Sequence, residues 1–405
     1  MRVDIKKSKL KGSINAPYSK SYAHRMLILA ALSNGESRIE GISDSEDMLA
    51  TIDCIRALGA EVLTDGDTAL IKGKSRGRIL DECIFPCRES GSTLRFMIPL
   101  SLMYCKKAVF TGTERLFSRG LGVYEELFEK NSVLLNKIPS GVEISGCLKA
   151  GYYEIRGDIS SQFVTGLLFL LPMFGEDSRL KVTEPVESRP YIDITLDILE
   201  KFRVSIQESG NNEFYIKGGR DYAAGDFRVE GDWSNAAFLY ALKELGNEIE
   251  IKGLNPWSIQ GDRVCKGHFK TLLREDAVID ISDCPDLGPV LFAFAAANKG
   301  ALFKGTKRLR IKESDRALSM GEELIKFGIK SEIGENTVRI IPGRLKAPTE
   351  ILEGHNDHRI VMALSVLCSI TGGRINGIEA VRKSYPDFFE RLKDLGLEAE
   401  YEAYQ

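Results

Sequence analysis

The stretch APYSKSYAHRMLILAAL, residues 16–32, decides how the rest of the chain is interpreted. It opens with the polar residues Lys20, His24 and Arg25 and then becomes almost wholly apolar. An apolar run of this length, rich in small and branched side chains, is typical of a buried helix. The start of a helix presents unpaired backbone N–H groups and the positive end of the helix dipole, which together attract anions. The stretch therefore predicts a buried helix with an anion site at its start.

Five further segments follow the same pattern of a polar opening and an apolar run. They are PCRESGSTLRFMIPLSL from Pro86, GDISSQFVTGLLFLL from Gly157, EGDWSNAAFLYAL from Glu230, DCPDLGPVLFAFAAA from Asp283 and HNDHRIVMALSVLCSI from His355. Each run is followed by a short strand, a second polar loop and an amphipathic helix, and hairpins close most units. The chain thus reads as six units of roughly 50 to 75 residues with the order β-α-β-α-β-β.

The turn-rich stretch GGRDYAAGD divides the six units into two groups of three. We expect a boundary near Gly225, so that one domain covers residues 13–225 and holds repeats one to three. The other domain covers residues 1–12 and 226–405 and holds repeats four to six. A chain of 405 residues with 43% hydrophobic content is long enough for about two or three domains.

Composition excludes several classes of protein. The formal net charge of −3 lacks the strongly basic field of proteins that bind nucleic acids or membrane surfaces non-specifically. The eight cysteines form no CxxC pair and the start of the chain has no apolar signal region, so we expect a reducing cytoplasm and no disulfide framework. The longest apolar run, FVTGLLFLLPMF, contains Pro172 and is too short to span a bilayer, so no membrane segment is expected.

Cations and hydroxyls gather at the repeated openings, although each motif alone has a simpler interpretation. SKSYAHR resembles an ordinary capped helix, and KESDR allows an exposed ion pair between Glu313 and Arg316 worth about 0.2–0.5 kcal/mol. His355 and His358 form an HxxH motif, but no third ligand is near in sequence and zinc is not expected. Cations at the same point of so many repeats favour a shared anion site instead.

Nine motifs together resemble one known family. In order along residues 15–390 they are SKSYAHR, ESGSTLR, SRGLG, SSQF, ESRPYIDIT, DCPD, IKESDR, NDHR and KSYPDFF. The chain resembles the 5-enolpyruvylshikimate-3-phosphate synthase family of enolpyruvyl transferases. The resemblance implies an α/β (α+β) fold: a two-domain inside-out α/β barrel of six β-α-β-α-β-β repeats, three per domain, with the active site in the interdomain cleft.

The resemblance also implies a reaction and its substrates. The enolpyruvyl group of phosphoenolpyruvate passes to the 5-hydroxyl of shikimate 3-phosphate and phosphate is released, without a redox cofactor or an essential metal, in a monomer that binds neither nucleic acid nor membrane. The residues implied for shikimate 3-phosphate are Lys20, Ser21, Arg25, Ser160, Ser161, Gln162, Ser188, Tyr191, Asp286 and Lys312. Those implied for phosphoenolpyruvate are Lys20, Gly91, Arg95, Arg119, Gln162, Arg316, Arg359 and Lys383.

Addition to phosphoenolpyruvate needs a base for the hydroxyl and an acid for the methylene carbon. We assign Asp286 as the base and Glu313 as the acid, with Lys20 stabilising charge as phosphate departs. Arginine suits both substrates because its planar fork pairs with carboxylate and phosphate through two hydrogen bonds.

Two departures and three alternatives stay open. Glu89 replaces the usual Asn of the family and could pair with Arg88, while Phe96 replaces a frequent Pro, which puts affinity for phosphoenolpyruvate mimics such as glyphosate in doubt.

The first alternative is the sister transferase that acts on UDP-N-acetylglucosamine, which typically has KNA where this chain has SKS, and a loop Cys where it has FSRGLG. The second is a nucleic-acid 3′-phosphate-processing relative, disfavoured by two Trp and the net charge. The third is an anion-binding module without chemistry.

Overall fold

The computed structural model describes residues 1–74 and 79–402, and the chain divides into two compact units. The continuous unit is Tyr18–Glu230, and the discontinuous unit joins Met1–Pro17 to Gly231–Gln405. Both crossings lie a few residues beyond the expected boundaries at 13 and 225. The reason is strand pairing: β2 (Lys11–Asn15) pairs with β16 (Glu248–Lys252) of the discontinuous unit, and β15 (Asp226–Arg228) pairs with β3 (Ser33–Glu40) of the continuous unit.

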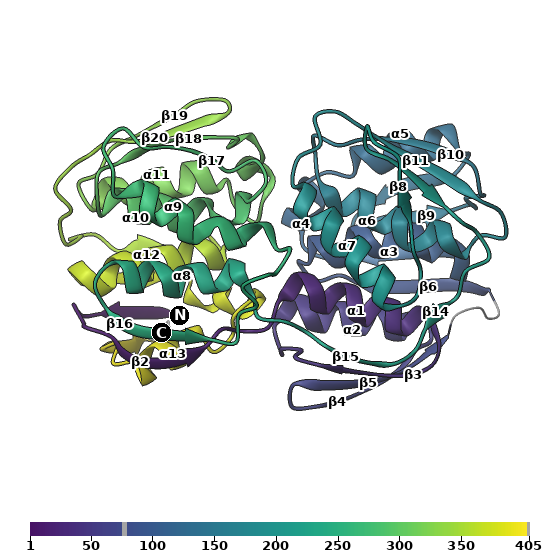
Figure 1. Ribbon diagram of the computed structural model, residues 1–405, viewed down its shortest axis with the longest axis horizontal. Helices are drawn as coiled ribbons and strands as arrows, with labels where there is room; N and C mark the ends of the chain where they lie inside the picture. The colour runs from purple at the N-terminus through teal and green to yellow at the C-terminus, as the bar shows by residue number, and fades with distance from the viewer. Residues whose placement is uncertain (75–78, 403–405) are drawn as a thin grey trace. The chain divides into compact units, whose positions relative to one another are not determined.

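The continuous unit contains three sheets, and each combines parallel with antiparallel strand pairs (Figure 1). The first sheet has the order β14-β3-β5-β4, with β15 also on β3; the new strands are β4 (Glu61–Asp65), β5 (Thr68–Lys74) and β14 (Tyr222–Ala223). The second has the order β6-β7-β9-β8, from β6 (Leu80–Pro86), β7 (Cys105–Thr111), β8 (Leu134–Ile138) and β9 (Gly141–Ser145). The third has the order β10-β11-β13-β12, from β10 (Tyr152–Arg156), β11 (Ser178–Thr183), β12 (Gln207–Glu208) and β13 (Glu213–Ile216).

The sheets of the discontinuous unit use both ends of the chain. One has the order β21-β22-β1-β23, from β1 (Arg2–Ile5), β21 (Leu352–Glu353), β22 (Gly373–Asn376) and β23 (Ala399–Glu402). Another has the order β17-β18-β20-β19, from β17 (Val278–Asp280), β18 (Ala301–Lys304), β19 (Ser331–Ile333) and β20 (Thr337–Ile340). The remaining pair is β2 with β16.

Each expected apolar run forms a buried helix, as predicted. These helices are α1 (Lys20–Leu32), α3 (Gly91–Tyr104), α6 (Ser161–Leu170), α8 (Trp233–Glu244), α10 (Gly288–Ala296) and α12 (His358–Thr371). In α1, all residues from Tyr22 to Leu32 are buried, because no face of the run is polar enough to prefer water. The polar openings therefore stand at the start of helices whose bodies form the core of each unit.

Further helices, each with both buried and more exposed residues, complete the two units. They are α2 (Glu46–Ala57), α4 (Glu114–Ser118), α5 (Gly122–Lys130), α7 (Arg189–Lys201), α9 (Cys265–Leu272), α11 (Arg316–Lys326) and α13 (Phe388–Asp394). Single 3₁₀ turns lie at Leu171–Met173, Gly261–Val264, Pro285–Leu287, Lys307–Ile311 and Ile378–Lys383. Among the described residues, no helix has the length and apolar character needed to cross a membrane.

The described residues contain one disulfide, which the cysteine pattern did not indicate. Cys83 on β6 is bonded to Cys105 on β7, two strands that lie side by side in parallel. The two cysteines are 22 residues apart in sequence, with a helix between them, and this spacing matches no motif from which the disulfide could be predicted. A single cross-link is not a disulfide framework, and Cys54, Cys87, Cys147, Cys265, Cys284 and Cys368 are thiols.

Candidate active site

Most candidate residues of the continuous unit lie near the starts of α1, α3 and α6, while Arg119 follows α4 and Ser188 and Tyr191 lie at the start of α7. Serine precedes each of α1, α3 and α6, at Ser19, Ser90 and Ser160. The hydroxyls of Ser90 and Ser160 accept hydrogen bonds from backbone N–H groups of the first turn. Each helix therefore begins in the polar segment that the sequence singled out.

Arg95, Gln162 and Arg119 come together around Gly91. Arg95 donates to the side-chain oxygen of Gln162 at 2.7 Å and to the backbone oxygen of Arg119 at 3.3 Å. Gln162 in turn donates to the Ser92 hydroxyl at 2.9 Å. A Cβ atom at Gly91 would lie 2.8 Å from the Arg119 guanidinium and 2.9 Å from that of Arg95, so only glycine leaves room for both. Two guanidinium groups thus stand beside the backbone of a helix start.

Arg25 of α1 lies over the ring of Phe96 of α3 and is held by α7. Its guanidinium donates to the backbone oxygens of Ser21 at 2.8 Å and Tyr191 at 3.1 Å, and to the Thr195 hydroxyl at 2.9 Å. Burial lowers the pKa of Arg25 to about 10, so it stays charged at neutral pH. Ser188, the residue before α7, has the left-handed φ of 56° and brings that helix start toward the same group.

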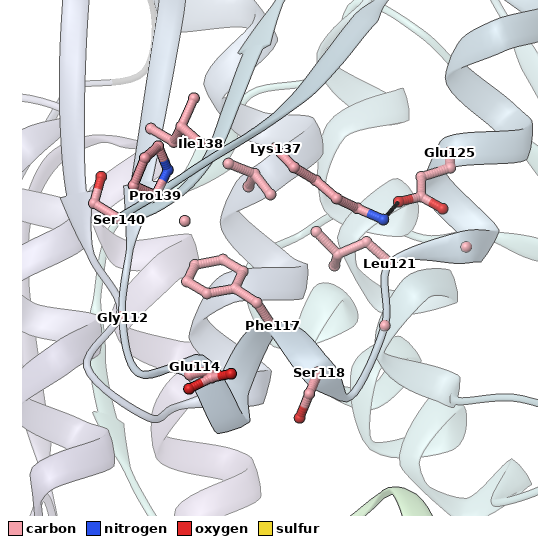
Figure 2. Close-up of a pocket in the computed structure, with 14 residues that line it drawn as sticks. Gly112, Glu114, Phe117, Ser118, Leu121, Glu125, Lys137, Ile138, Pro139 and Ser140 are labelled. Carbon is pink, nitrogen blue, oxygen red and sulfur yellow. Dashed lines mark ion pairs between the residues drawn. The ribbon is translucent and has the colours of Figure 1, made fainter.

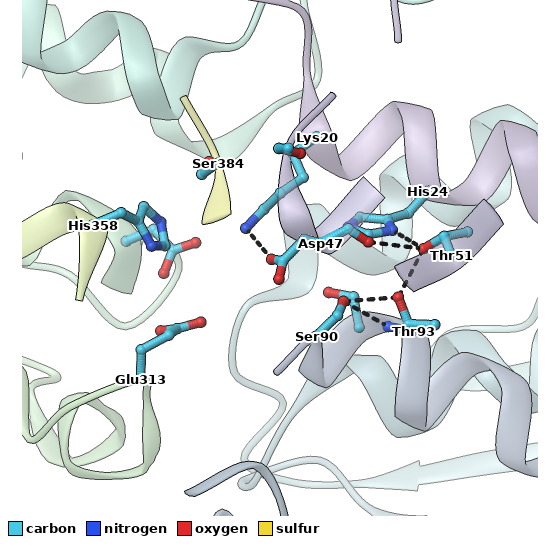
Figure 3. A network of polar contacts seen from close by, with 12 residues as sticks. Lys20, His24, Asp47, Thr51, Ser90, Thr93, Glu313, His358 and Ser384 are labelled. Atoms are coloured by element: carbon cyan, nitrogen blue, oxygen red, sulfur yellow. Dashed lines mark hydrogen bonds and ion pairs between the residues drawn. The ribbon is translucent and has the colours of Figure 1, made fainter. Parts of the chain in front are cut away.

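A series of buried polar contacts, which no sequence motif indicates, supports the starts of α1 and α3 (Figure 3). Lys20 forms an ion pair of 2.8 Å with Asp47 of α2. Behind it, His24 lies 2.6 Å from the Thr51 hydroxyl, which lies 2.7 Å from that of Thr93. The Thr93 hydroxyl donates to Ser90 at 2.7 Å. Burial and the nearby cations hold the pKa of His24 well below its usual range. The imidazole is therefore neutral, and the contacts from His24 to Ser90 carry no charge.

Arg316 is the centre of the candidate residues in the discontinuous unit. It donates to Asp286 at 2.8 Å, to Glu313 at 2.7 Å and to Asp357 at 2.8 Å, and its side chain is 1% exposed. Burial alone would lower the pKa of Arg316, but the three carboxylates raise it above its ordinary value. The pair with Glu313 that the sequence allowed on a wet face is thus formed, but it is buried.

Asp286 receives two more cations. Lys312 lies 3.1 Å from one carboxylate oxygen, and Arg359 lies 3.3 Å from the other. Burial lowers the pKa of Lys312 to about 8, although Asp286 opposes the shift. Lys383 donates to the backbone oxygen of Asn356, next to the Asp357 that caps α12. The structure therefore brings Glu313 and all the implied cations of this unit to one cluster.

Other candidate residues lie elsewhere or have other partners. Arg310, at the polar opening of α11, donates to the backbone oxygen of Gly334 in the β19–β20 hairpin. Arg88, the expected partner of Glu89, forms ion pairs with Glu46 and with Asp53 at 2.9 Å.

A cavity of about 640 Å³ lies beside the segment that carries Arg119 (Figure 2). The ring of Phe117 and the side chain of Leu121 line it, and Lys137 and Glu125 form an ion pair of 3.1 Å at its edge. The segment that holds Arg119 thus also forms one wall of the cavity. Within residues 1–74 and 79–402, no group of three or more His, Cys, Asp or Glu side chains is placed to hold a metal ion.

The chain is similar to proteins of one family. A family model described as EPSP synthase (3-phosphoshikimate 1-carboxyvinyltransferase) matches residues 5–392. A 3-phosphoshikimate 1-carboxyvinyltransferase of Clostridium perfringens is 40% identical over 98% of both chains. One of Clostridium kluyveri is 40% identical over 98% of this chain and 97% of its own.

Solved structures share the fold at lower identity. An EPSP synthase from Acinetobacter baumannii superposes with a TM-score of 0.80 at 21% identity and covers 100% of both chains. A second structure of EPSP synthase from the same organism has a TM-score of 0.79 at 22% identity and covers 98% of this chain and 99% of its own. The likeness holds over the full length of the mixed α/β chain.

Proposed function

The chain belongs to the EPSP synthase family, and on that premise we propose that it transfers the enolpyruvyl group of phosphoenolpyruvate to the 5-hydroxyl of shikimate 3-phosphate. The products are 5-enolpyruvylshikimate 3-phosphate and inorganic phosphate, a step of the shikimate pathway toward aromatic amino acids. The curated relatives carry the name of this transferase over nearly their whole length.

One observation supports the reaction most strongly: Asp286 and Glu313 bond to the same guanidinium, at 2.8 and 2.7 Å. Addition–elimination needs two proton-transfer groups held in one charged site. In our proposal Asp286 accepts the proton of the 5-hydroxyl of shikimate 3-phosphate. The oxygen of that hydroxyl attacks C2 of phosphoenolpyruvate, and Glu313 gives a proton to C3. The tetrahedral intermediate then returns a proton from C3, breaks its C2–O bond to phosphate and restores the double bond.

The cations of both units fit the charges of the two substrates. A phosphate carries about −1.5 to −2 at neutral pH, and each substrate adds a carboxylate. We propose that shikimate 3-phosphate contacts Lys20, Ser21, Arg25, Ser160, Ser161, Gln162, Ser188, Tyr191, Asp286 and Lys312. We propose that phosphoenolpyruvate contacts Lys20, Gly91, Arg95, Arg119, Gln162, Arg316, Arg359 and Lys383. Lys20, paired with Asp47, would stabilise charge as phosphate leaves.

We also propose that each unit is a domain built as an inside-out α/β barrel of three β-α-β-α-β-β repeats. The combination of parallel and antiparallel strand pairs that recurs in the four- and five-stranded sheets supports this description. The expected cytoplasmic location and monomeric state stay predictions.

The test is phosphate release from phosphoenolpyruvate by the full chain, with shikimate 3-phosphate and, in parallel, with UDP-N-acetylglucosamine. Release only with the shikimate ester supports the proposal. Release only with the sugar nucleotide would move the chain to the sister reaction, and release with neither would leave an anion-binding protein without this chemistry.

A further inference from the structure

A buried carboxylate of the discontinuous unit has no part in the proposed reaction. Glu323, on α11, is 1% exposed, and both of its oxygens accept hydrogen bonds. Lys326 Nζ donates to Oε1 at 3.0 Å and to Oε2 at 2.9 Å, and the backbone N–H of Glu353 donates to Oε2 at 2.9 Å. His355 Nε2 lies 3.0 Å from Oε1. The carboxylate therefore joins helix α11 to strand β21 and to the turn that follows β21.

The turn joined to Glu323 has an uncommon backbone. His355 and Asn356 both have a φ of 49°, in the left-handed region that residues other than glycine rarely adopt. Such a backbone persists only where its surroundings hold it. The imidazole of His355 is held by Glu323, and the carbonyl of Asn356 accepts a hydrogen bond from Lys383. Each of the two left-handed residues therefore has its own anchor.

The residue after this turn belongs to the candidate site. Asp357 accepts from Arg316 Nε at 2.8 Å and from the backbone N–H of Arg359 at 2.9 Å. Arg316 is the first residue of α11, and Glu323 lies two helical turns further along, about 10 Å by helical rise. Helix α11 therefore grips the same segment at two points. A turn released at His355 is free to shift Asp357 and Arg359 against Arg316.

The charges of the pair favour a strong hold. The hydrogen bond to Glu323 raises the pKa of His355, although burial lowers it, and the carboxylates of Glu323 and Glu322 add to the rise. Burial by itself would raise the pKa of Glu323, but its three donors lower it. Lys326 faces the pair from the same helix and opposes the rise at His355.

We propose that Glu323 is a positioning residue for phosphoenolpyruvate: it holds His355 in the left-handed turn and thereby fixes Asp357 and Arg359 against Arg316. This inference rests on the proposed function, because it uses the cations that we assign to that substrate. The HxxH motif then has a role without metal, since its first histidine anchors the turn that begins α12.

The first test compares Glu323→Gln with the wild-type chain, using KM for each substrate and kcat. A misplacement of about 1 Å can lower the rate about a hundredfold. We therefore expect the KM for phosphoenolpyruvate to rise by about tenfold or more. The KM for shikimate 3-phosphate should stay within about twofold, because most of its proposed contacts lie in the continuous unit. The matched control is Glu332→Gln, an exposed carboxylate on β19 of the same unit, which should keep wild-type constants.

Equal KM values in Glu323→Gln and wild type, or a loss of folded protein with unchanged KM values, would overturn the inference alone. Absence of wild-type turnover with shikimate 3-phosphate would contradict the proposed function and the inference with it.

A second pair of variants decides the matter if Glu323→Gln does not fold. His355→Gly and His355→Ala both remove the imidazole, but glycine adopts a positive φ readily and alanine does not. We expect the KM for phosphoenolpyruvate to rise more in His355→Ala than in His355→Gly. Equal values in the two variants would show that the turn backbone does not control the site.

Discussion

Arg316 shows at the scale of one residue how burial changes an interaction that the sequence can suggest. Three residues before it in the chain stands Glu313, and an exposed pair at that spacing contributes about 0.2–0.5 kcal/mol. Here the guanidinium is 1% exposed and serves Asp286 and Asp357 as well. Removing one partner of a buried pair leaves an uncompensated charge, so we expect the loss of Glu313 alone to cost more stability than the loss of one partner from an exposed pair.

Replacement of Glu313 by Gln keeps an acceptor for Arg316 but removes the acid of the proposed reaction. We expect kcat to fall by about 10²- to 10⁴-fold, and the KM for phosphoenolpyruvate to change only a few-fold. Steady-state kinetics of phosphate release measures both constants. Glu335→Gln, on the exposed β19–β20 turn, is the control and should retain wild-type kcat. A Glu313→Gln enzyme with wild-type kcat would remove this residue from the chemistry.

The lowered pKa of Lys312 gives a dependence on pH. Its ammonium lies 3.1 Å from Asp286, and burial lowers its pKa to about 8. The charge is therefore present below about pH 8 and lost above it, so the KM for shikimate 3-phosphate should rise as the pH passes through that value. In Lys312→Arg the charge persists, and the same pH range should leave KM flat. An identical rise in both proteins would assign it to another group.

The same pKa bears on stability, with the opposite sense. The pKa of Lys312 in the folded state lies below the ordinary value of 10.5, so the folded chain releases this proton first. Between about pH 8 and the ordinary pKa of 10.5, the unfolded chain binds this proton and the folded chain does not. The contribution of Lys312 to the free energy of unfolding therefore rises with pH over that range.

Single residues also show what the sequence could not predict. The polar openings pointed to Lys20, Arg95 and Arg316, because cations at helix starts carry a readable signal. No sequence signal indicates that Lys20 pairs with Asp47 or that Glu323 bonds to His355. Each of these pairs joins segments that only the fold brings together.

Gly166 shows the same dependence at the scale of elements, where α6 packs on α3. A Cβ there would lie 2.6 Å from the backbone oxygen of Arg95 and would also meet the hydroxyl of Tyr124. We expect Gly166→Ala to lower the free energy of unfolding by about 1–3 kcal/mol and to raise the KM for phosphoenolpyruvate by moving Arg95. Denaturant unfolding and steady-state kinetics measure the two effects.

The control is Gly267→Ala in α9, where the new methyl group has nothing within 4 Å. Because alanine is the better helix former, this variant should gain about 0.5–1 kcal/mol. Similar stability changes in both variants would contradict the close approach of α3 and α6.

Helices were more predictable than strand partners. The apolar runs predicted the six buried helices, because a helix that is buried on all sides has an apolar local composition. The pairing of β1 with β22 and β23, and of β2 with β16, joins residues more than two hundred positions apart. Local patterns contain no record of such partners, which is why both domain boundaries were expected a few residues early.

At the scale of the whole molecule, the proposed contacts of each substrate are divided between the two units. Ligands that need residues of both units should bind cooperatively. We expect shikimate 3-phosphate and phosphoenolpyruvate together to raise Tm by more than the sum of their separate shifts, measured by calorimetry in Glu313→Gln, in which turnover is slowed. Additive shifts would mean that each substrate binds one unit on its own.

The most direct test of the whole account is turnover in D₂O with phosphoenolpyruvate and shikimate 3-phosphate, followed by mass spectrometry of the products. In D₂O the acid proposed at Glu313 carries deuterium and adds it to C3 of phosphoenolpyruvate. The account predicts phosphate together with 5-enolpyruvylshikimate 3-phosphate that contains deuterium in its methylene group. Absence of that product, or product free of deuterium, would contradict it.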